Sequence, residues 1–292
     1  ELTWTPVKGL EIKGNFTYMF NTTRYTNRQV NTEYSQYPGE ISTLTSGKME
    51  DKLYEKSMTH TYYQANLYGT FERTFAQDHN FKAMVGFNWE TKFLKDVAAT
   101  GDNLLSETLN DLNLVGQGAD GDKRMEVGGG QNEYALMGFF GRLNYDYKGK
   151  YLVEASGRYD GKRGQRWGFF PSFSLGWRVS EEAFFDGIRD QFNNLKLRFS
   201  YGQLGNQNVG FYDYIRKISI GSQSYLFGGD KPTTATSSAP VASDLSWERS
   251  IHKNLGVDMS FLNNRLAFSA DFYIRDTKDM LTAGIALPAT YG

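Results

Sequence analysis

The most explicit chemical motif in the sequence is GQGADG at residues 116–121, which matches the glycine pattern of a dinucleotide-binding loop. That chemistry needs a preceding strand and a following helix whose N-terminus holds the pyrophosphate. Here Asp122, three more charged residues and three glycines at 128–130 follow the motif. The segment is interpreted as a flexible loop, and no cofactor is expected.

Two groups of side chains were considered as metal ligands. Asp120 and Asp122 offer carboxylate oxygens, which Ca²⁺ prefers, but apart from Glu126 no other carboxylate lies near them and the spacing of an EF-hand loop is absent. Three histidines are far apart in the sequence, at His60, His79 and His252. They lack the spacing of a metal site, so a solvated loop tip and ordinary structural histidines are the favoured interpretation.

Adjacent carboxylates at Glu181 and Glu182 open the stretch EEAFFDGIRDQF. Neighbours in a helix do not face each other, so acid–base chemistry is disfavoured. Acidic residues near the positive end of a helix are favourable, and a helix-start role is expected instead. The chain has no cysteine and no Ser, His and Asp arrangement in a recognisable context. We expect no enzymatic activity.

A larger set of charged residues falls on the polar face of segments in which apolar and polar residues alternate. Their positions are Glu154, Arg158, Asp160, Arg178, Lys196, Arg198, Asp258, Asp271 and Arg275. Side chains at i and i+2 of a strand share one face, so these charges are expected on a single face of a sheet.

Nine segments with this alternation predict nine strands. They are residues 10–21, 63–72, 81–90, 137–147, 151–160, 169–179, 195–202, 251–261 and 265–275, with Lys253 as an exception on an apolar face. Several exceed ten residues. A strand of about eleven residues rises roughly 36 Å, and a tilt of about 40° brings it near the apolar thickness of a bilayer.

The connections between these strands alternate in length. Short ones are 76–80, 148–150, 262–264 and a longer 181–194 with room for a helical turn; long ones are 27–60, 98–132, 205–246 and a trimmed one at 161–168. Outer-membrane barrels have short periplasmic turns and long external loops. Aromatic residues near strand ends, such as Tyr159 and Trp177, are expected in two interfacial girdles.

Composition agrees with an all-β protein. Aromatics make up 15% of the chain, there are 31 Gly and 6 Pro, and the mean hydropathy of −0.55 leaves no apolar run long enough for a transmembrane helix. The net charge of −1 lacks the basic face of a nucleic-acid-binding protein. A soluble, lipocalin-like barrel is the alternative, but nine long strands exceed its eight.

Four runs of sequence resemble one known family. They are LMGFFGRLNYDYKGKYLVEASGRYDG (136–161), RWGFFPSFSLGWRVSEEAFF (166–185), NLKLRFSYGQLGNQN (194–208) and NLGVDMSFLNNRLAFSADFYIRDTKDML (254–281). In this order they resemble the barrel of SusC/RagA-type TonB-dependent outer-membrane transporters of Bacteroidota. The resemblance implies an all-β, transmembrane antiparallel β-barrel of 22 strands, occluded by an N-terminal plug.

Residues 1–292 are therefore expected to form part of that barrel domain in the cell outer membrane, as a multi-pass protein. Nine strands are an odd number and cannot close an antiparallel barrel, so we expect a fragment of the wall, without plug domain or signal peptide. The implied partners are a SusD-like surface lipoprotein, the TonB–ExbB–ExbD complex acting on the plug, outer-membrane lipid, and an oligosaccharide or peptide substrate.

In this framework the nine charged residues face the lumen, where they solvate it and hold the plug by ion pairs; contact with substrate is the alternative. Aromatic residues of the external loops are expected either to stack on sugar rings or to pack against the lipoprotein lid: Tyr34, Tyr37, Tyr212, Tyr214, Tyr225 and Phe227. The predicted function is TonB-dependent uptake of oligosaccharides. Alternatives are uptake of peptides, siderophore or cobalamin, and a passive porin or structural barrel.

Overall fold

The computed structural model covers residues 1–292. It describes residues 1–44, 51–117, 124–164, 167–189, 191–206, 210–212, 214–222, 228–229, 231–237 and 246–280. Asp120, Asp122, Tyr225 and Phe227, which the sequence analysis singled out, lie outside these residues.

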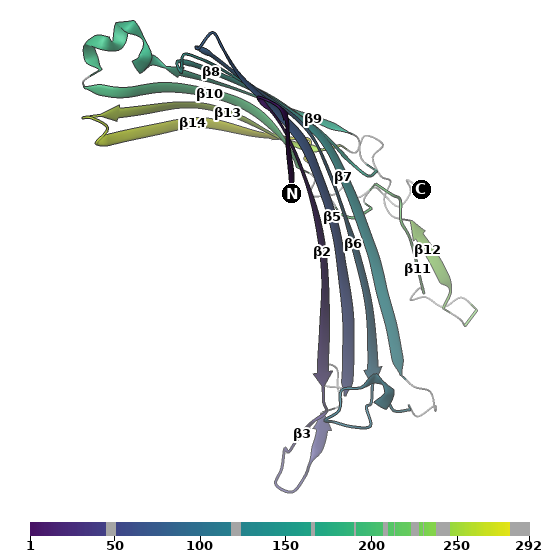
Figure 1. Ribbon diagram of the computed structural model, residues 1–292. Coiled ribbons are helices and arrows are strands. Elements are labelled where there is room, and N and C mark those ends of the chain that lie inside the picture. The colour runs from purple at the N-terminus through teal and green to yellow at the C-terminus, as the bar shows by residue number, and fades with distance from the viewer. Residues whose placement is uncertain are drawn as a thin grey trace. The chain divides into compact units, whose positions relative to one another are not determined.

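Ten strands form one sheet in the order β1-β2-β5-β6-β7-β8-β9-β10-β13-β14 (Figure 1). Their bounds are β1 Leu2–Val7, β2 Leu10–Gln29, β5 Lys52–Phe75, β6 His79–Asp102, β7 Met125–Tyr147, β8 Tyr151–Lys162, β9 Gly168–Arg178, β10 Phe192–Asn206, β13 Glu248–Phe261 and β14 Leu266–Lys278. In this sheet each strand lies beside the one before it along the chain. Two hairpins stand apart: β3 (Thr32–Tyr34) with β4 (Ser42–Leu44), and β11 (Ile218–Ser222) with β12 (Thr233–Ser237).

All nine predicted strands are present, and the open antiparallel sheet confirms the predicted fold class. A tenth strand, β1, was missed because it has six residues and its pairing with β2 shifts register between Trp4 and Val7, around Pro6. Strand β5 also begins about ten residues earlier than predicted. Its first part, from Lys52 to Tyr62, carries polar residues on both faces, so alternation could not reveal it.

The short turns lie together at one end of the strands and are joined to one another by backbone hydrogen bonds. Lys148 N donates to Asp78 O over 2.8 Å, which links the β7–β8 turn to the β5–β6 turn, and Arg178 N donates to Lys150 O over 2.8 Å. Gly149 has a φ of +66°, which glycine adopts without strain. The longer connections, 30–51, 103–124 and 207–247, join the opposite strand ends as predicted. The β8–β9 connection at that end, residues 163–167, is an exception, because it is shorter than the β9–β10 connection at the short-turn end.

The chain divides into two compact units. The wall unit consists of Glu1–Phe16, Ala65–Glu90 and Ala135–Gly292. The extension unit consists of Thr17–Gln64 and Thr91–Tyr134. Strands β2, β5, β6 and β7, with 20 to 24 residues each, contribute to both units, whereas β8 to β14 of the main sheet have 11 to 15 residues and belong to the wall unit alone.

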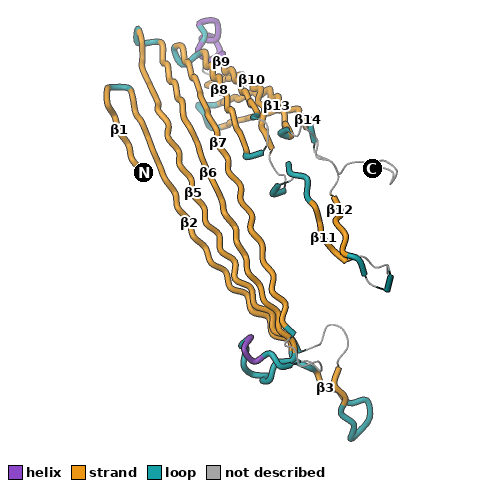
Figure 2. Tube along the Cα trace, turned by 90° about the vertical axis from the view of Figure 1, so that its right-hand side faces the viewer, coloured by secondary structure: helices purple, strands orange, loops and turns teal. Residues whose placement is uncertain are grey.

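In the described part of the wall unit, no helix covers either face of the sheet (Figure 2). The connection between β9 and β10 holds two 3₁₀ helices, η2 (Val179–Glu181) and η3 (Ala183–Ile188), and a third, η1 (Leu112–Leu114), belongs to the extension unit. None of the helices formed by the described residues has the length and apolar character needed to cross a bilayer.

Candidate functional site

The pairing register places all nine charged candidates on one face of the wall unit. Residues directly opposite each other in neighbouring strands project to the same face. One row across the sheet runs through Asn144, Glu154, Ser174, Ser200, Asn254 and Tyr273. Each of the nine charged residues is either a member of this row or an even number of residues away from the row's member in its own strand. All nine therefore project to the same side of the sheet, which we call the polar face.

Arg198 is the centre of an ion-pair network on the polar face that joins β10, β13 and β14. Its Nε donates to Asp258 Oδ2 over 2.7 Å, and its NH2 lies 3.2 Å from Asp271 Oδ1. Ser269 donates to Asp258 Oδ1 over 2.6 Å, and Asn254 donates to Asp271 Oδ1 over 3.2 Å. Each carboxylate therefore meets one cation and one neutral donor, an arrangement that keeps charged groups satisfied on a wet surface.

Glycines create the space that this network occupies. A Cβ added at Gly256 would lie 2.6 Å from Asp271 Oδ1 and 2.8 Å from Arg198 Cζ. At Gly138 an added Cβ would collide with the carboxylate of Asp160. These glycines were not among the residues predicted from the sequence, although a glycine inside a strand often marks a close approach of this kind.

A second group of polar contacts lies on β7 and β8. Arg158 Nε donates to both carboxylate oxygens of Asp160 over 2.6 and 2.7 Å, and its guanidinium carbon lies 5.8 Å from the ring centre of Phe140. Glu154 accepts from Asn144 Nδ2 over 2.6 Å and lies 3.6 Å from Arg142. These contacts order side chains along the face without any nucleophile paired to a base.

Three candidates have a different environment. Arg275 Nε contacts His252 Nε2 over 3.3 Å. Lys196 is directly opposite Arg178 of β9 and, on its other side, directly opposite Asp258 of β13, so its charge faces a carboxylate as well as a cation. Lys196, with Glu154 and Arg198, lines a hollow of about 510 Å³.

The opposite face of the wall unit is apolar and exposed. One row runs through Tyr145, Val153, Leu175, Phe199, Leu255 and Phe272. Phe199 is 42% exposed, Leu255 59% and Phe272 69%. Lys253 lies on this face as the alternation indicated, and a long lysine stem can carry its charge to a water boundary. A continuous apolar surface of this extent marks contact with an apolar medium or a partner.

Aromatic side chains gather at both ends of the apolar face. At the short-turn end, Tyr147 stacks on Tyr151 with ring centres 6.3 Å apart, and Tyr151 pairs with Trp177. At the other end, Tyr159 stacks on Trp167 at 4.8 Å. The ten residue steps from Trp167 to Trp177 rise roughly 33 Å, and a tilt of about 40° reduces this to roughly 25 Å, the height of an outer-membrane apolar band.

Glu182 ties the β9–β10 connection to the short-turn end of the apolar face. Its Oε1 accepts from Tyr151 OH over 2.6 Å and from Trp177 Nε1 over 3.1 Å, and Lys150 Nζ lies 3.5 Å from its Oε2. The hydrogen bonds from Tyr151, then Trp177, hold the pKa of Glu182 below its ordinary value. Glu182 stands at the N-cap position of η3 and Glu181 in η2, so both lie at a helix start as predicted; the side chain of Glu182 makes these contacts instead of a capping hydrogen bond.

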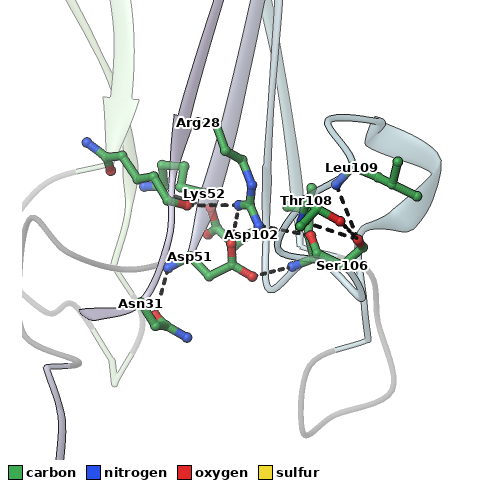
Figure 3. A network of polar contacts seen from close by, with 10 residues as sticks. Arg28, Asn31, Asp51, Lys52, Asp102, Ser106, Thr108 and Leu109 are labelled. Carbon is green, nitrogen blue, oxygen red and sulfur yellow. Dashed lines mark hydrogen bonds and ion pairs between the residues drawn. The ribbon is translucent and has the colours of Figure 1, made fainter. Parts of the chain in front are cut away.

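In the extension unit, Asp51 organises a network of polar contacts (Figure 3). Its carboxylate pairs with Arg28 and accepts from Leu104 N over 2.8 Å, while Arg28 NH2 donates to Ser106 O over 3.1 Å. Arg28 and Asp51 side chains are each only 11% exposed. Beside them, Leu53, Leu104 and Val115 form a small buried core. The network fixes residues 103–106 to the ends of β2 and β5.

The candidate loop aromatics differ in exposure. Tyr34 and Tyr37 of the extension unit are 40% and 66% exposed. Tyr212 and Tyr214 of the wall unit are half-buried, with ring centres 6.4 Å apart, and Tyr214 lies against Gly164. Of these four described rings, Tyr34 and Tyr37 are the more exposed.

The motifs set aside in the sequence also have a structural context. After GQGADG the next described residues enter strand β7 at Met125. The described residues contain no group of three or more His, Asp or Glu side chains that could hold a metal ion.

Comparisons with known proteins agree with one another. The model of a family described as "TonB dependent receptor-like, beta-barrel" matches residues 1–292. TonB-dependent receptor P39 of Formosa agariphila is 30% identical over 254 residues, covering 84% of this chain and 23% of that protein. TonB-dependent receptor SusC of Bacteroides thetaiotaomicron is 36% identical over 157 residues, which is 51% of this chain and 15% of SusC.

Among solved structures, the RagAB peptide transporter superposes with a TM-score of 0.80 at 23% identity, covering 99% of this chain and 30% of that one. At this identity the likeness concerns the fold. The chain thus spans less than a third of the length of each of these relatives.

Proposed function

We propose, from the premise that this chain belongs to the TonB-dependent receptor β-barrel family, that it forms part of the wall of an outer-membrane nutrient importer. The family consists of transporters and not of enzymes. The observation that carries the proposal is the two-faced sheet of the wall unit. Nine charged residues share one face, and the row from Tyr145 to Phe272 makes the other face apolar.

The apolar face is assigned to the bilayer. In a membrane barrel every second residue faces lipid, so large apolar side chains are exposed in the protein and covered by acyl chains. The exposed Phe199, Leu255 and Phe272 fit that role, and the aromatic groups around Trp167 and Trp177 fit the two interfaces. The short turns then face the periplasm and the long connections the outside.

The polar face is assigned to the lumen. Its ion pairs, such as Arg198 with Asp258, keep the wall hydrated without presenting one strong sign of charge. Arg178, which lies opposite Lys196, is available to an acidic group of the plug or to substrate. Transport chemistry here consists of opening a wet path along this face.

The proposed substrate is an oligosaccharide, delivered by a SusD-like surface lipoprotein and moved by TonB–ExbB–ExbD acting on a plug. Support comes from the exposed rings of Tyr34 and Tyr37 near the loop end of β2, because the C–H faces of sugar rings pack against aromatic faces. The likeness to SusC and RagAB supports the partners, since both represent the same receptor architecture.

The test uses the full-length protein together with the proposed SusD-like lipoprotein. Calorimetry against linear and branched oligosaccharides and against peptides of matched length should show glycan binding that Tyr37→Ala weakens and Tyr37→Phe retains. Preferential binding of peptides would overturn the substrate assignment. Uptake by cells that persists after loss of TonB would overturn energised import in favour of a passive porin.

A further inference from the structure

The connection between β9 and β10 is the longest of the connections at the short-turn end of the strands. Here η2 and η3 occupy residues 179–188. Two apolar side chains of this segment are exposed: Phe184 by 72% and Ile188 by 44%. Their neighbours Val179, Ser180 and Phe185 are buried, so the segment is packed against the wall while it presents these two residues outward.

The segment is attached on the apolar side of the sheet at both of its ends. At its start, Glu182 accepts hydrogen bonds from Tyr151 and Trp177, which belong to the apolar face. Towards its end, Phe185 packs edge-on against Phe192 with ring centres 6.3 Å apart, and Phe192 packs against Phe261 at 4.7 Å.

Phe261 lies on the apolar face because it follows Val257 and Met259 in steps of two along β13. The contacts of Glu182 and Phe185 therefore place the segment at the rim of the apolar face, not at the mouth of the polar one.

The backbone of the segment is fixed by its own polar contacts. Arg189 donates from Nε and NH2 to Ser180 O over 3.1 and 2.7 Å, and its NH2 lies 3.1 Å from Asp186 Oδ1. The exposure of Phe184 and Ile188 thus belongs to an ordered turn. Charged groups surround the two apolar residues, as expected of a segment that meets both water and lipid.

The neighbouring turn continues the same apolar rim. Leu262 and Leu266, at the β13–β14 turn, are 64% and 56% exposed. Asn264 N of this turn donates to Asn193 Oδ1 over 3.0 Å, just beyond η3, so the two connections lie side by side. Leu266 lies at the same end of the apolar face as Trp177 and Tyr151, and Leu262 lies in the turn just beyond it.

We propose that η3 is an interfacial lipid anchor. Phe184 and Ile188 insert among the parts of the acyl chains nearest the headgroups of the periplasmic leaflet, while Glu182, Lys150 and Arg189 lie at the level of the headgroups. The occupant of this surface is phospholipid, because the rim is continuous with the face assigned to the bilayer and flanked by the aromatic belt. The inference rests on the proposed membrane placement. It adds that a periplasmic connection, and not only strands, contacts lipid.

The test measures depth in the membrane with spin labels on the full-length protein in phosphatidylethanolamine–phosphatidylglycerol vesicles. This chain has no cysteine, so Phe184→Cys introduces a single label site here once any cysteines elsewhere are replaced. We expect Phe184→Cys to be several-fold more accessible to oxygen than to a nickel chelate, at a depth shallower than Phe199→Cys. Asp186→Cys, on the same turn, should favour the nickel chelate.

If the label at Phe199→Cys is accessible to oxygen and not to the nickel chelate, the strands lie in lipid. Equal accessibility of the labels at positions 184 and 186 to the nickel chelate would then overturn the proposed anchor. Shielding of position 184 from both reagents would also overturn it, because a protein partner would then cover the site. A water-exposed label at Phe199→Cys would instead overturn the membrane placement. If Phe184→Cys impairs folding, Ile188→Cys provides the same measurement.

Discussion

The outward apolar face of the wall unit and the small core of the extension unit order the same residue types in different ways. In the wall unit, large apolar side chains such as Phe199 and Leu255 are exposed, and the ion pairs around Arg198 lie on the other face of a single sheet. In the extension unit, Leu53 is fully buried and an ion pair between Arg28 and Asp51 is nearly so.

This difference corresponds to two solvents. A sheet that exposes an apolar face is stable only where an apolar medium covers it, whereas a segment in water must bury its apolar groups and satisfy the polar groups buried with them. Strands β2, β5, β6 and β7 contribute to both units, so one strand can follow both rules in succession. The comparison predicts that equivalent substitutions have different effects in the two units.

The largest effect is expected from Asp51→Ala in the extension unit. Removing this carboxylate leaves Arg28 buried without its partner and Leu104 N without its acceptor, at a local cost of about 3–5 kcal/mol. Hydrogen exchange of the full-length protein should show faster exchange at residues 103–105. The half-exposed pair Lys52–Asp102, 3.8 Å apart, is the matched control, and Lys52→Ala should cost less than about 1 kcal/mol.

A smaller but still large effect is expected from a charge on the apolar face of the wall unit. Phe199→Arg should destabilise the protein in lipid vesicles by about 2–4 kcal/mol, because the guanidinium must leave water. The neighbouring Ser200→Arg projects to the polar face and should cost about 1 kcal/mol or less. Equal losses in urea unfolding from vesicles would contradict the assignment of the two faces.

The smallest effect concerns pH and Glu182. Its folded pKa is lowered below the ordinary 4.5, so its contribution to stability is present above about pH 4.5 and is lost as the pH falls through the folded value. Between pH 6 and pH 3 the full-length protein should lose more thermal stability than the Glu182→Gln variant. An identical acid dependence of Tm in both would show that the hydrogen bonds of Tyr151 and Trp177 to Glu182 contribute nothing.

Much of the wall could be predicted from the sequence because alternation is a local property. Side chains in a strand alternate whatever the neighbouring strand is, so Glu154, Arg158 and Asp160 are placed on one face by spacing alone. The extra length of β5 could not be predicted, since its first part is polar on both faces. The place of Glu182 at a helix start could be predicted, but its hydrogen-bond partners could not, because Tyr151 and Trp177 come from two other strands.

The sequence by itself determined the two-faced strands, the alternation of short and long connections and the resemblance to one receptor family, because these depend on local spacing and on runs of residues. The tertiary structure alone decided the register. In the wall unit, the register brings Arg198 to Asp258 and Asp271, beside Gly256. In the extension unit, the tertiary structure brings Asp51 to Arg28 and to the backbone N of Leu104. A slip of one residue would turn every side chain of a strand to the other face, and no local pattern records which neighbour it meets.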